Sequence, residues 1–483
     1  MEEVLLNEGF AQGFNYALTI AVAISVLFTV FLLTLPSQYN PFHDSPPLPA
    51  GSATTRARND NGIKKNWRKG GTTHVVVLGD IGRSPRMQYH AISIAKNGGR
   101  VYLIGYVESE IHPQILSDSR ITVVPIAPAP AFLRQSSRAL FPVIAPLKAL
   151  WQAGSLYWAL CYRAVHPGRW MLVQNPPSIP TLAVASLVCL FRNTRLVCDW
   201  HNFGYTILAL KLGPKHPLVW ISAFYERFFS RLAISHLTVT HAMKDVLEKQ
   251  FGIKGALTLH DRPVSSFHPI SEQERAAFLQ RLPETAPFAE NLLPSAKEMW
   301  KLITSSTSWT PDEDFQILLD ALTAYSAQAG SNPKLPKLLV LITGKGPLKE
   351  HYLTKIRKNP LSHVLIRTAW LTPEDYALLL ASADMGVSLH TSSSGVDLPM
   401  KVVDLFGAGT PVLAHKFQAL GELVKEGENG LGFSHSEELS DLIVKVFQDD
   451  VLLEKLKDGA LRESKHRWDD EWDSVAGKLL KLV

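Results

Sequence analysis

The stretch from Ser388 to Leu413 reads SLHTSSSGVDLPMKVVDLFGAGTPVL. A short apolar run, Met385 to Leu389, leads into a loop of small residues, and an amphipathic segment with Lys401 and Asp404 follows. This order predicts a strand, a loop and a helix, which together place free backbone N–H groups where an anion can bind. An ordinary turn is the alternative interpretation, because serine and glycine occur in loops of every kind.

Other apolar runs of strand length alternate with helical segments along the chain. They are Val75–Asp80, Val101–Gly105, Ile121–Pro125, Trp170–Gln174, Arg195–Asp199, Leu237–Val239, the start of Leu302–Trp309 and the start of Leu338–Pro347. Continuous apolar runs are typical of parallel strands that are buried on both faces. The pattern therefore predicts an α/β fold with doubly wound parallel sheets.

The length of 483 residues is too great for one ordinary hydrophobic core. We expect two Rossmann-like domains that face a cleft, the first over residues 73–264 and the second over residues 301–450. Residues 265–300 form the connection between them. The last segment, 451–483, is helical and is expected to pack back toward the first domain.

The composition excludes several classes of protein. Hydrophobic residues make up 46% of the chain and charged residues 19%, the net charge is +5, and three cysteines cannot form a disulfide framework. No cysteine–histidine cluster has zinc spacing, so we expect no metal site. A P-loop signature is absent from the sequence, and no G-x-G-x-x-G follows the first strand, which argues against kinase and NAD chemistry.

The N-terminal region has the pattern of a membrane anchor. Residues 17–35 carry no charged side chain, and a helix of that length spans roughly 29 Å, close to the thickness of a bilayer core. We expect a short lumenal segment over 1–16, an uncleaved transmembrane helix over 17–35 and a flexible linker over 36–72. Acidic residues before the span and basic residues after it place the folded domains in the cytosol.

The region from Ser119 to Cys198 contains no aspartate or glutamate. Its cations are interleaved with aromatic residues between Ala131 and Val165, which suits an anionic membrane surface. Nucleic acid is the rival partner for such a stripe, and the apolar N-terminal segment favours the membrane instead. A hydrophobic core with a few solvated arginines is the structural alternative. The cations are Arg120, Arg134, Arg138, Lys148, Arg163, Arg169, Arg192 and Arg195.

Three small-residue loops of the second domain follow strand ends, the place where open α/β sheets bind ligands. Lys345 and Lys401 add positive charge to these loops. The loops and the two lysines together can hold a diphosphate and neutralise the charge of a leaving group without a metal. The candidate donor-binding residues are Ser305, Thr307, Ser308, Gly344, Lys345, Gly346, Ser393, Ser394, Gly395, Val396, Lys401 and Asp404.

Several motifs resemble a known family. DRPVSSFHP, TGKGP and VVDLFGAGTPVL are similar to GT-B glycosyltransferases. GDIGRSPRMQYHA, DWHNFGYTIL, SSTSWTPDEDFQILLDAL and SSSGVDLPMKVVDLFGAG narrow the resemblance to the chitobiosyldiphosphodolichol β-mannosyltransferases. The resemblance extends over roughly residues 74–450.

The resemblance implies an inverting transfer of mannose from GDP-mannose to GlcNAc2 on a dolichyl diphosphate, on the cytosolic face of the endoplasmic reticulum. It implies no tightly bound cofactor and leaves the need for a divalent cation open. The membrane and other dolichol-pathway mannosyltransferases are the expected partners. A different polyprenyl-diphosphate glycosyltransferase and an inactive membrane-anchored GT-B subunit are the rival hypotheses.

One departure from the broader GT-B pattern lies in the stretch from Ser388 to Leu413. Many retaining relatives carry a glutamate eight residues before the acidic residue that corresponds to Asp404, where this chain has Val396. A lysine that many of them use for pyrophosphate is also missing near Asp312–Asp314. Lys345 and Lys401 thereby become the candidate diphosphate cations, and Asp404 is a candidate for binding ribose or sugar hydroxyls or, alternatively, part of a solvated helix face.

The residues that contact the acceptor are predicted from the loop after the first strand. Gly82, Arg83, Ser84 and Arg86 follow the first strand, and arginine binds phosphate in a bidentate manner, so we assign this loop to the acceptor diphosphate. A turn with surface arginines is the alternative.

Inversion requires a base for the acceptor hydroxyl. The candidates at strand ends are Asp80, Asp199, His201 and His90, and we favour His201.

Overall fold

The computed structural model describes residues 15–30, 71–134, 141–293, 296, 300–310 and 313–483. The chain divides into two compact units. The first is Met1–Val173 with Ile179–Leu196, and the second is Gln174–Ser178 with Val197–Val483.

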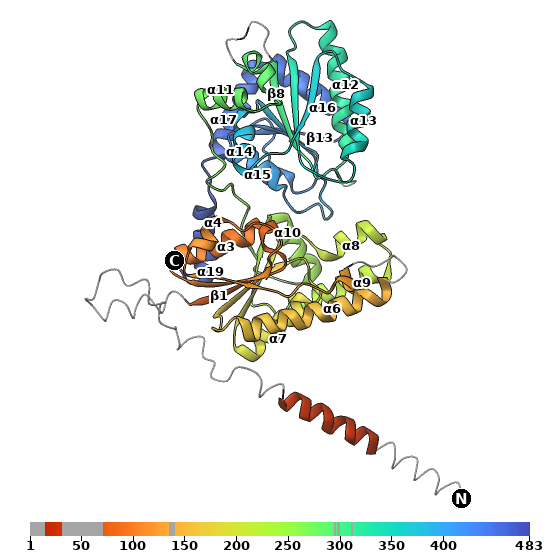
Figure 1. Ribbon diagram of the computed structural model, residues 1–483, viewed down its shortest axis with the longest axis vertical. Helices are drawn as coiled ribbons and strands as arrows, with labels where there is room; N and C mark the ends of the chain where they lie inside the picture. The colour runs from red at the N-terminus through yellow and green to blue at the C-terminus, as the bar shows by residue number, and fades with distance from the viewer. Residues whose placement is uncertain (1–14, 31–70, 135–140, 294–295, 297–299, 311–312) are drawn as a thin grey trace, which may run out of the picture. The chain divides into compact units, whose positions relative to one another are not determined.

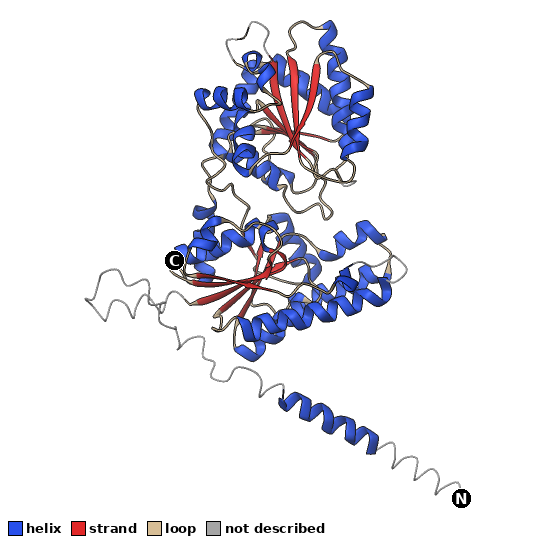
Figure 2. Ribbon diagram, viewed as in Figure 1, coloured by secondary structure: helices blue, strands red, loops and turns tan. Residues whose placement is uncertain are grey.

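The strands form two parallel sheets, which confirms the predicted α/β class (Figures 1 and 2). The first sheet has the order β3-β2-β1-β4-β5-β6-β7. Its strands are β1 (Thr72–Asp80), β2 (Arg100–Tyr106), β3 (Ile121–Pro125), β4 (Trp170–Asn175), β5 (Arg195–Trp200), β6 (Ser235–Thr238) and β7 (Leu257–Thr258). The second sheet has the order β10-β9-β8-β11-β12-β13. Its strands are β8 (Trp300–Ser306), β9 (Lys337–Thr343), β10 (Val364–Ala369), β11 (Met385–Ser388), β12 (Val412–His415) and β13 (Gly430–Phe433).

Helices lie between these strands and after the last of them. Between β1 and β8 they are η1 (Ile81–Arg83), α3 (Pro85–Lys96), α4 (Pro113–Ser117), α5 (Ala131–Arg134), α6 (Phe141–Trp158), η3 (Ala159–Arg163), α7 (Thr181–Arg192), α8 (Gly204–Leu212), α9 (Pro217–Ser230), α10 (His241–Val246), η4 (Leu247–Phe251), α11 (Glu272–Arg281), η5 (Ala286–Phe288) and η6 (Glu290–Leu292). After β8 they are α12 (Phe315–Ser331), α13 (Lys349–Lys358), α14 (Pro373–Ser382), α15 (Met400–Gly407), η7 (Leu420–Glu422), α16 (Ser436–Gln448), α17 (Asp450–Glu463), α18 (Trp468–Trp472), η8 (Asp473–Gly477) and α19 (Lys478–Leu480).

The strand β9 shows why the second sheet is covered on both faces. Leu338, Val340 and Ile342 pack into one core with α12, α13 and α16. Leu339 and Leu341 pack into a separate core with α11 and α14. Alternate side chains point to opposite faces of a strand, so a continuous apolar run supplies both cores at once. Figure 1 shows these helices on either side of the sheet.

The start of α12 differs from the pattern in the sequence. In the sequence, Thr310 and Pro311 predict a helix with the threonine as its N-cap, the proline as its first residue and Asp312 to Asp314 in its first turn. In the structure α12 begins at Phe315, and the Asp314 side chain accepts a hydrogen bond from the Gln316 N–H at 3.0 Å. Residues 311 and 312 lie outside the described residues. The aspartate therefore caps the helix in place of the threonine.

Residues 15–30 form a helix in which every residue is exposed. Within the part of the chain that the structure describes, none of the helices is both long enough and apolar enough to cross a membrane. The end of the expected anchor, 31–35, and nearly all of the expected linker over 36–72 lie outside the described residues.

Gly459 offers a test of the packing of α17. A Cβ atom there would overlap the backbone carbonyl of Glu428, whereas a Cβ at Gly421 would meet no atom within 4 Å. Gly459→Ala should therefore lower the free energy of unfolding by about 1–3 kcal/mol, because the backbone has to move. Urea unfolding of the full chain measures the change. The control, Gly421→Ala, should stay within about 0.5 kcal/mol of wild type, and equal stability of the two variants would contradict this packing.

Candidate functional site

A cavity of about 760 Å³ lies at the carboxyl ends of β8 and β9, bounded by the loop before α14 and the start of α15. This is the edge where open α/β sheets bind ligands. Of the predicted donor-binding residues, Thr307, Ser308, Gly344 and Lys401 line it. The lining also contains Ser306, which lies within the predicted loop from Ser305 to Ser308. The residues of the lining that were not predicted are Thr343, Trp370, Leu371, Thr372, Pro373 and Tyr376.

Gly344 and Gly346 hold two of the predicted loops against each other. A Cβ atom on Gly344 would overlap the carbonyl oxygen of Thr307, and one on Gly346 would overlap that of Ser308. Gly344 also has a φ of +121°, which favours glycine. Both glycines are therefore required for the loops to pack, whether or not a ligand is bound.

The two candidate cations have different surroundings. Lys401 forms an ion pair with Glu313, whose carboxylate also accepts hydrogen bonds from the Thr307 hydroxyl at 2.8 Å and the Ser308 N–H at 2.7 Å. Burial opposes ionisation of Glu313, but the charge of Lys401 and these hydrogen bonds lower its pKa below the usual value. The ammonium of Lys345 lies 3.7 Å from the centre of the Trp370 ring. Glu313 thus holds Lys401 at the cavity, and Trp370 holds Lys345 in a cation–π contact.

Asp404 lies near Tyr376, a residue of the cavity lining. The Tyr376 hydroxyl is 3.0 Å from the Ser306 hydroxyl, and its pKa is raised by burial and by the charge of Asp404. Burial, together with the nearby Asp261, raises the pKa of Asp404 to about 7. A carboxyl group of this kind can accept or donate a hydrogen bond near neutral pH.

Other predicted donor residues are engaged within the protein. Ser305 is buried, and its hydroxyl donates to the Val387 carbonyl at 2.9 Å. In the serine loop the Gly395 N–H donates to the Ser392 hydroxyl at 2.7 Å, and the Val396 N–H lies 3.4 Å from the Ser394 hydroxyl. The side chain of Val396 is itself buried.

The helix α15 begins only at Met400, so its N-terminus does not directly follow the serine loop. Asn202, which belongs to the same unit, donates to the hydroxyl of Ser393 and to the carboxylate of Asp397, both at 3.1 Å. The loop is thus fixed by side chains. The expected row of free N–H groups is not seen at Gly395 and Val396.

His201 and Asp199 form a pair at the end of β5. The Nε2 atom of His201 lies 2.8 Å from the buried carboxylate of Asp199, and the imidazole remains partly exposed. The His201 N–H donates to the Asn175 carbonyl at 2.9 Å. A carboxylate behind a histidine fixes the tautomer of the ring, which leaves Nδ1 of His201 able to take a proton.

Glu226 of α9 supports the loop that carries His201. It is fully buried and accepts hydrogen bonds from the Asn175 amide at 2.6 Å, the Ser178 hydroxyl at 3.0 Å and the Gly204 N–H at 3.1 Å. Burial raises its pKa, and these hydrogen bonds counter the effect. No pattern in the sequence singled out this residue, because a lone glutamate in an apolar helix has no signature.

The acceptor-side candidates lie in the first unit, around η1. The carboxylate of Asp80 accepts from the Glu108 N–H at 3.0 Å and the Ser109 N–H at 3.2 Å. Burial acts against ionisation of this carboxyl group, yet the hydrogen bonds keep its pKa below the usual value. A carboxylate with a low pKa that holds a loop is poorly suited to act as a base.

The residues that follow differ in exposure. Arg83 is exposed and donates to the Ser109 hydroxyl at 3.2 Å. Gly82 packs against the backbone of Ser109, and the Ser84 hydroxyl donates to the Asp80 carbonyl at 3.0 Å. Arg86 is only 4% exposed. Of these side chains, Arg83 is the cation that a surface diphosphate can reach.

His90 is fully buried in α3. It therefore lacks the access to an acceptor hydroxyl that a general base requires.

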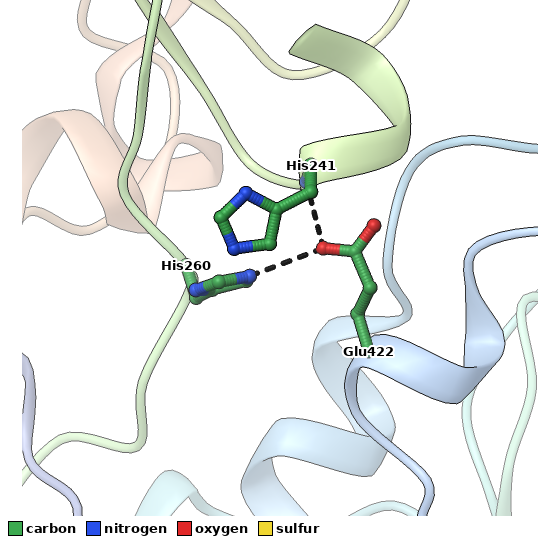
Figure 3. Close-up of side chains that lie close together, drawn as sticks. All are labelled: His241, His260 and Glu422. Carbon is green, nitrogen blue, oxygen red and sulfur yellow. Dashed lines mark hydrogen bonds and ion pairs between the residues drawn. The ribbon is translucent and has the colours of Figure 1, made fainter. Parts of the chain in front are cut away.

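Figure 3 shows a cluster of His241 at the start of α10, His260 just after β7 and Glu422 of η7. Their potential ligand atoms lie within 4.8 Å of one another, so the cluster could hold a cation, although sequence spacing predicted no metal site. Nε2 of His260 lies 3.1 Å from Glu422, and its Nδ1 lies 3.0 Å from Glu471. An imidazolium between two carboxylates satisfies all of these contacts without a metal.

Comparison with known proteins gives consistent matches. The sequence profile described as Glycosyl transferases group 1 matches residues 301–449. A chitobiosyldiphosphodolichol beta-mannosyltransferase of Arthroderma benhamiae is 51% identical over 386 residues, which cover 78% of this chain and 85% of that protein. The protein of that name from Homo sapiens is 43% identical over 440 residues, covering 84% and 93%. The crystal structure of Anabaena HepE in complex with UDP has a TM-score of 0.58 at 17% identity, covering 84% of this chain and 99% of that chain, and shares the fold.

The His260 cluster predicts a pH dependence of stability. Burial lowers the pKa of His260, but hydrogen bonds to Glu422 and Glu471 outweigh it and raise the pKa from 6.5 to about 9. The stabilisation is therefore complete below about pH 6.5 and is lost as the pH rises through 9. The pKa of Glu471 falls from 4.5 to about 2, so its contribution is present above about pH 4.5 and is lost toward pH 2.

Urea unfolding of wild type and His260→Gln at pH 6 and pH 9 measures this effect. Wild type should lose more stability than the variant between the two pH values, because only wild type carries the titrating imidazole. Equal losses would show that His260 is not an ion-pair partner of the two glutamates.

Proposed function

This chain belongs to the family of chitobiosyldiphosphodolichol β-mannosyltransferases, and we propose that it uses GDP-mannose as donor and inverts the anomeric carbon. It is a glycosyltransferase with two parallel sheets in the GT-B fold. The observation that carries the donor proposal is the cavity at the carboxyl ends of β8 and β9, which lies within the part matched by the glycosyltransferase profile.

In the proposed reaction the diphosphate of the donor lies near Lys345 and Lys401. The acceptor hydroxyl attacks the anomeric carbon, the bond from that carbon to the diphosphate oxygen breaks, and GDP leaves with the electron pair. Positive groups that are already in place stabilise the charge that develops on the diphosphate. Glu313 keeps Lys401 in position through their ion pair, and Asp404 is a candidate partner for a hydroxyl of the donor.

The proton of the acceptor hydroxyl is proposed to move to Nδ1 of His201. Asp199 accepts from the opposite nitrogen and stabilises the imidazolium that forms. Glu226 is a positioning residue in this scheme, because it holds Asn175 and Gly204 on either side of the histidine loop. The His201 side chain is partly exposed, so a substrate can reach it.

The acceptor is proposed to be GlcNAc2 on a dolichyl diphosphate at the cytosolic face of the endoplasmic reticulum. Arg83 is the proposed contact for the acceptor diphosphate. A membrane anchor over 17–35 belongs to this proposal because no charged side chain occurs there. The acid-free region from Ser119 to Cys198 suits contact with anionic lipid, and other dolichol-pathway mannosyltransferases are proposed partners.

An assay of the detergent-solubilised full chain tests the proposed donor and stereochemistry. GDP-mannose, GDP-glucose and UDP-glucose are each incubated with a GlcNAc2-diphosphate lipid, and the product linkage is determined by NMR. We expect β-linked mannose from GDP-mannose and at least about tenfold lower turnover with the other donors. An α-linked product would contradict inversion, and equal use of UDP-glucose would contradict the donor assignment.

His201→Ala should lower kcat by about 10²–10⁴-fold, the usual contribution of a general base, while the KM for the donor changes little. The limb of the pH–rate profile that reports the base should also disappear. His351→Ala is the matched control, since His351 is an exposed histidine of α13 outside the cavity lining. Turnover of His201→Ala within about threefold of wild type would remove His201 as the base.

A further inference from the structure

The first unit contains a second cavity, of about 590 Å³, beside α6. Its volume is within the range of about 300–1,000 Å³ that is typical of small-molecule pockets. Pro125 and Ala127 border it at the end of β3, and Ala159 and Arg163 border it in the π-helical turn η3. Such turns occur frequently at functional sites.

Most of the lining is apolar. Leu150, Trp151 and Trp158 are large apolar residues of the lining, and they are 69%, 41% and 57% exposed. The Trp158 ring stacks on Tyr162 with ring centres 4.5 Å apart, which fixes its position. A cavity bordered by exposed aromatic and aliphatic side chains offers apolar area to an apolar ligand.

Among the residues that line the cavity, the charged one is a cation, Arg163. Arg163 is exposed at its border, and its guanidinium donates to the Pro125 carbonyl. The sequence from Ser119 to Cys198 contains no carboxylate side chain. An apolar ligand with an anionic end group therefore matches both the lining and the charge of this cavity.

Gly154 supplies a further observation. It lies in α6 and lines the cavity, and a Cβ atom there would meet no atom within 4 Å. Glycine destabilises a helix relative to alanine, and among the residues that the structure describes no neighbouring atom requires a glycine at this position. Because Gly154 lines the cavity, a larger side chain at this position would reduce the space for a ligand.

We propose that this cavity binds the segment of the acceptor's polyprenyl chain next to the diphosphate, with Arg163 at its border facing the anionic group. The inference rests on the proposed function, because it takes the polyprenyl diphosphate as the acceptor. The same apolar chemistry could accept an acyl chain of a membrane phospholipid, and the experiment below distinguishes the two.

Filling the cavity tests the proposal through the acceptor. Gly154→Ala, Gly154→Leu and Gly154→Trp add side chains of increasing size, and kcat and KM are measured with GlcNAc2-diphosphate on a polyprenyl chain and on a short alkyl chain. The loss of contacts in an apolar pocket lowers the affinity for an apolar ligand by about tenfold or more. We expect the KM for the polyprenyl acceptor to rise in the order Ala, Leu, Trp, by about tenfold or more for Trp, with the KM for the short-chain acceptor nearly constant.

Gly421→Leu is the matched control, because it places a side chain at another open glycine, outside this cavity. Its KM values should equal those of wild type. Thermal unfolding of each variant excludes loss of the fold as the cause. A KM for the polyprenyl acceptor that does not respond to Gly154→Trp would overturn the proposal. Weaker binding of all Gly154 variants to phosphatidylcholine–phosphatidylserine vesicles, with unchanged KM values, would assign the cavity to membrane lipid.

A binding measurement separates this inference from the proposed reaction. A polyprenyl diphosphate with a diazirine on its first isoprene unit is photolysed with the full chain, and the labelled peptide is mapped. Label on α6 or η3 that Gly154→Trp removes would support the cavity even if no mannosyl transfer occurred. Label confined to other peptides would overturn the inference even in an active enzyme.

Discussion

Leu338 to Ile342 of β9 contact two different hydrophobic cores, and this burial of both faces of a strand governs where the protein can place its chemistry. A side chain in the middle of such a strand has no access to solvent, so polar groups that bind or react have to lie at the strand ends. The cavity at Ser306–Ser308, Thr343 and Gly344 lies at those ends. The pair of His201 and Asp199 likewise lies at the end of β5. The apolar strands therefore determine the position of both polar sites.

This constraint explains which features could be predicted from sequence. The apolar runs identified β1 to β6 with small differences at their ends, because burial on both faces leaves a strong local pattern. The loops after β8 and β9 were predicted because loop position follows from strand position. Thr307, Ser308 and Gly344 line the cavity for that reason.

Contacts between residues that lie far apart in the sequence could not be predicted from local patterns. Glu313 looked like an acidic residue in the first turn of a helix, and its ion pair with Lys401 joins positions far apart in the chain. Ser305 was grouped with its neighbours, yet alternation along β8 turns its hydroxyl toward Val387. His260 and Glu471 have no shared motif, since their contact depends on how the C-terminal helices fold against the β7 loop.

The ion pair between Lys401 and Glu313 has a consequence for the proposed reaction. The ammonium of Lys401 is already paired with a carboxylate, so in that reaction it would add little net attraction to an intact nucleotide sugar. It would interact most strongly with the charge that develops on the departing diphosphate. A cation that acts in this way would contribute more to turnover than to ground-state binding.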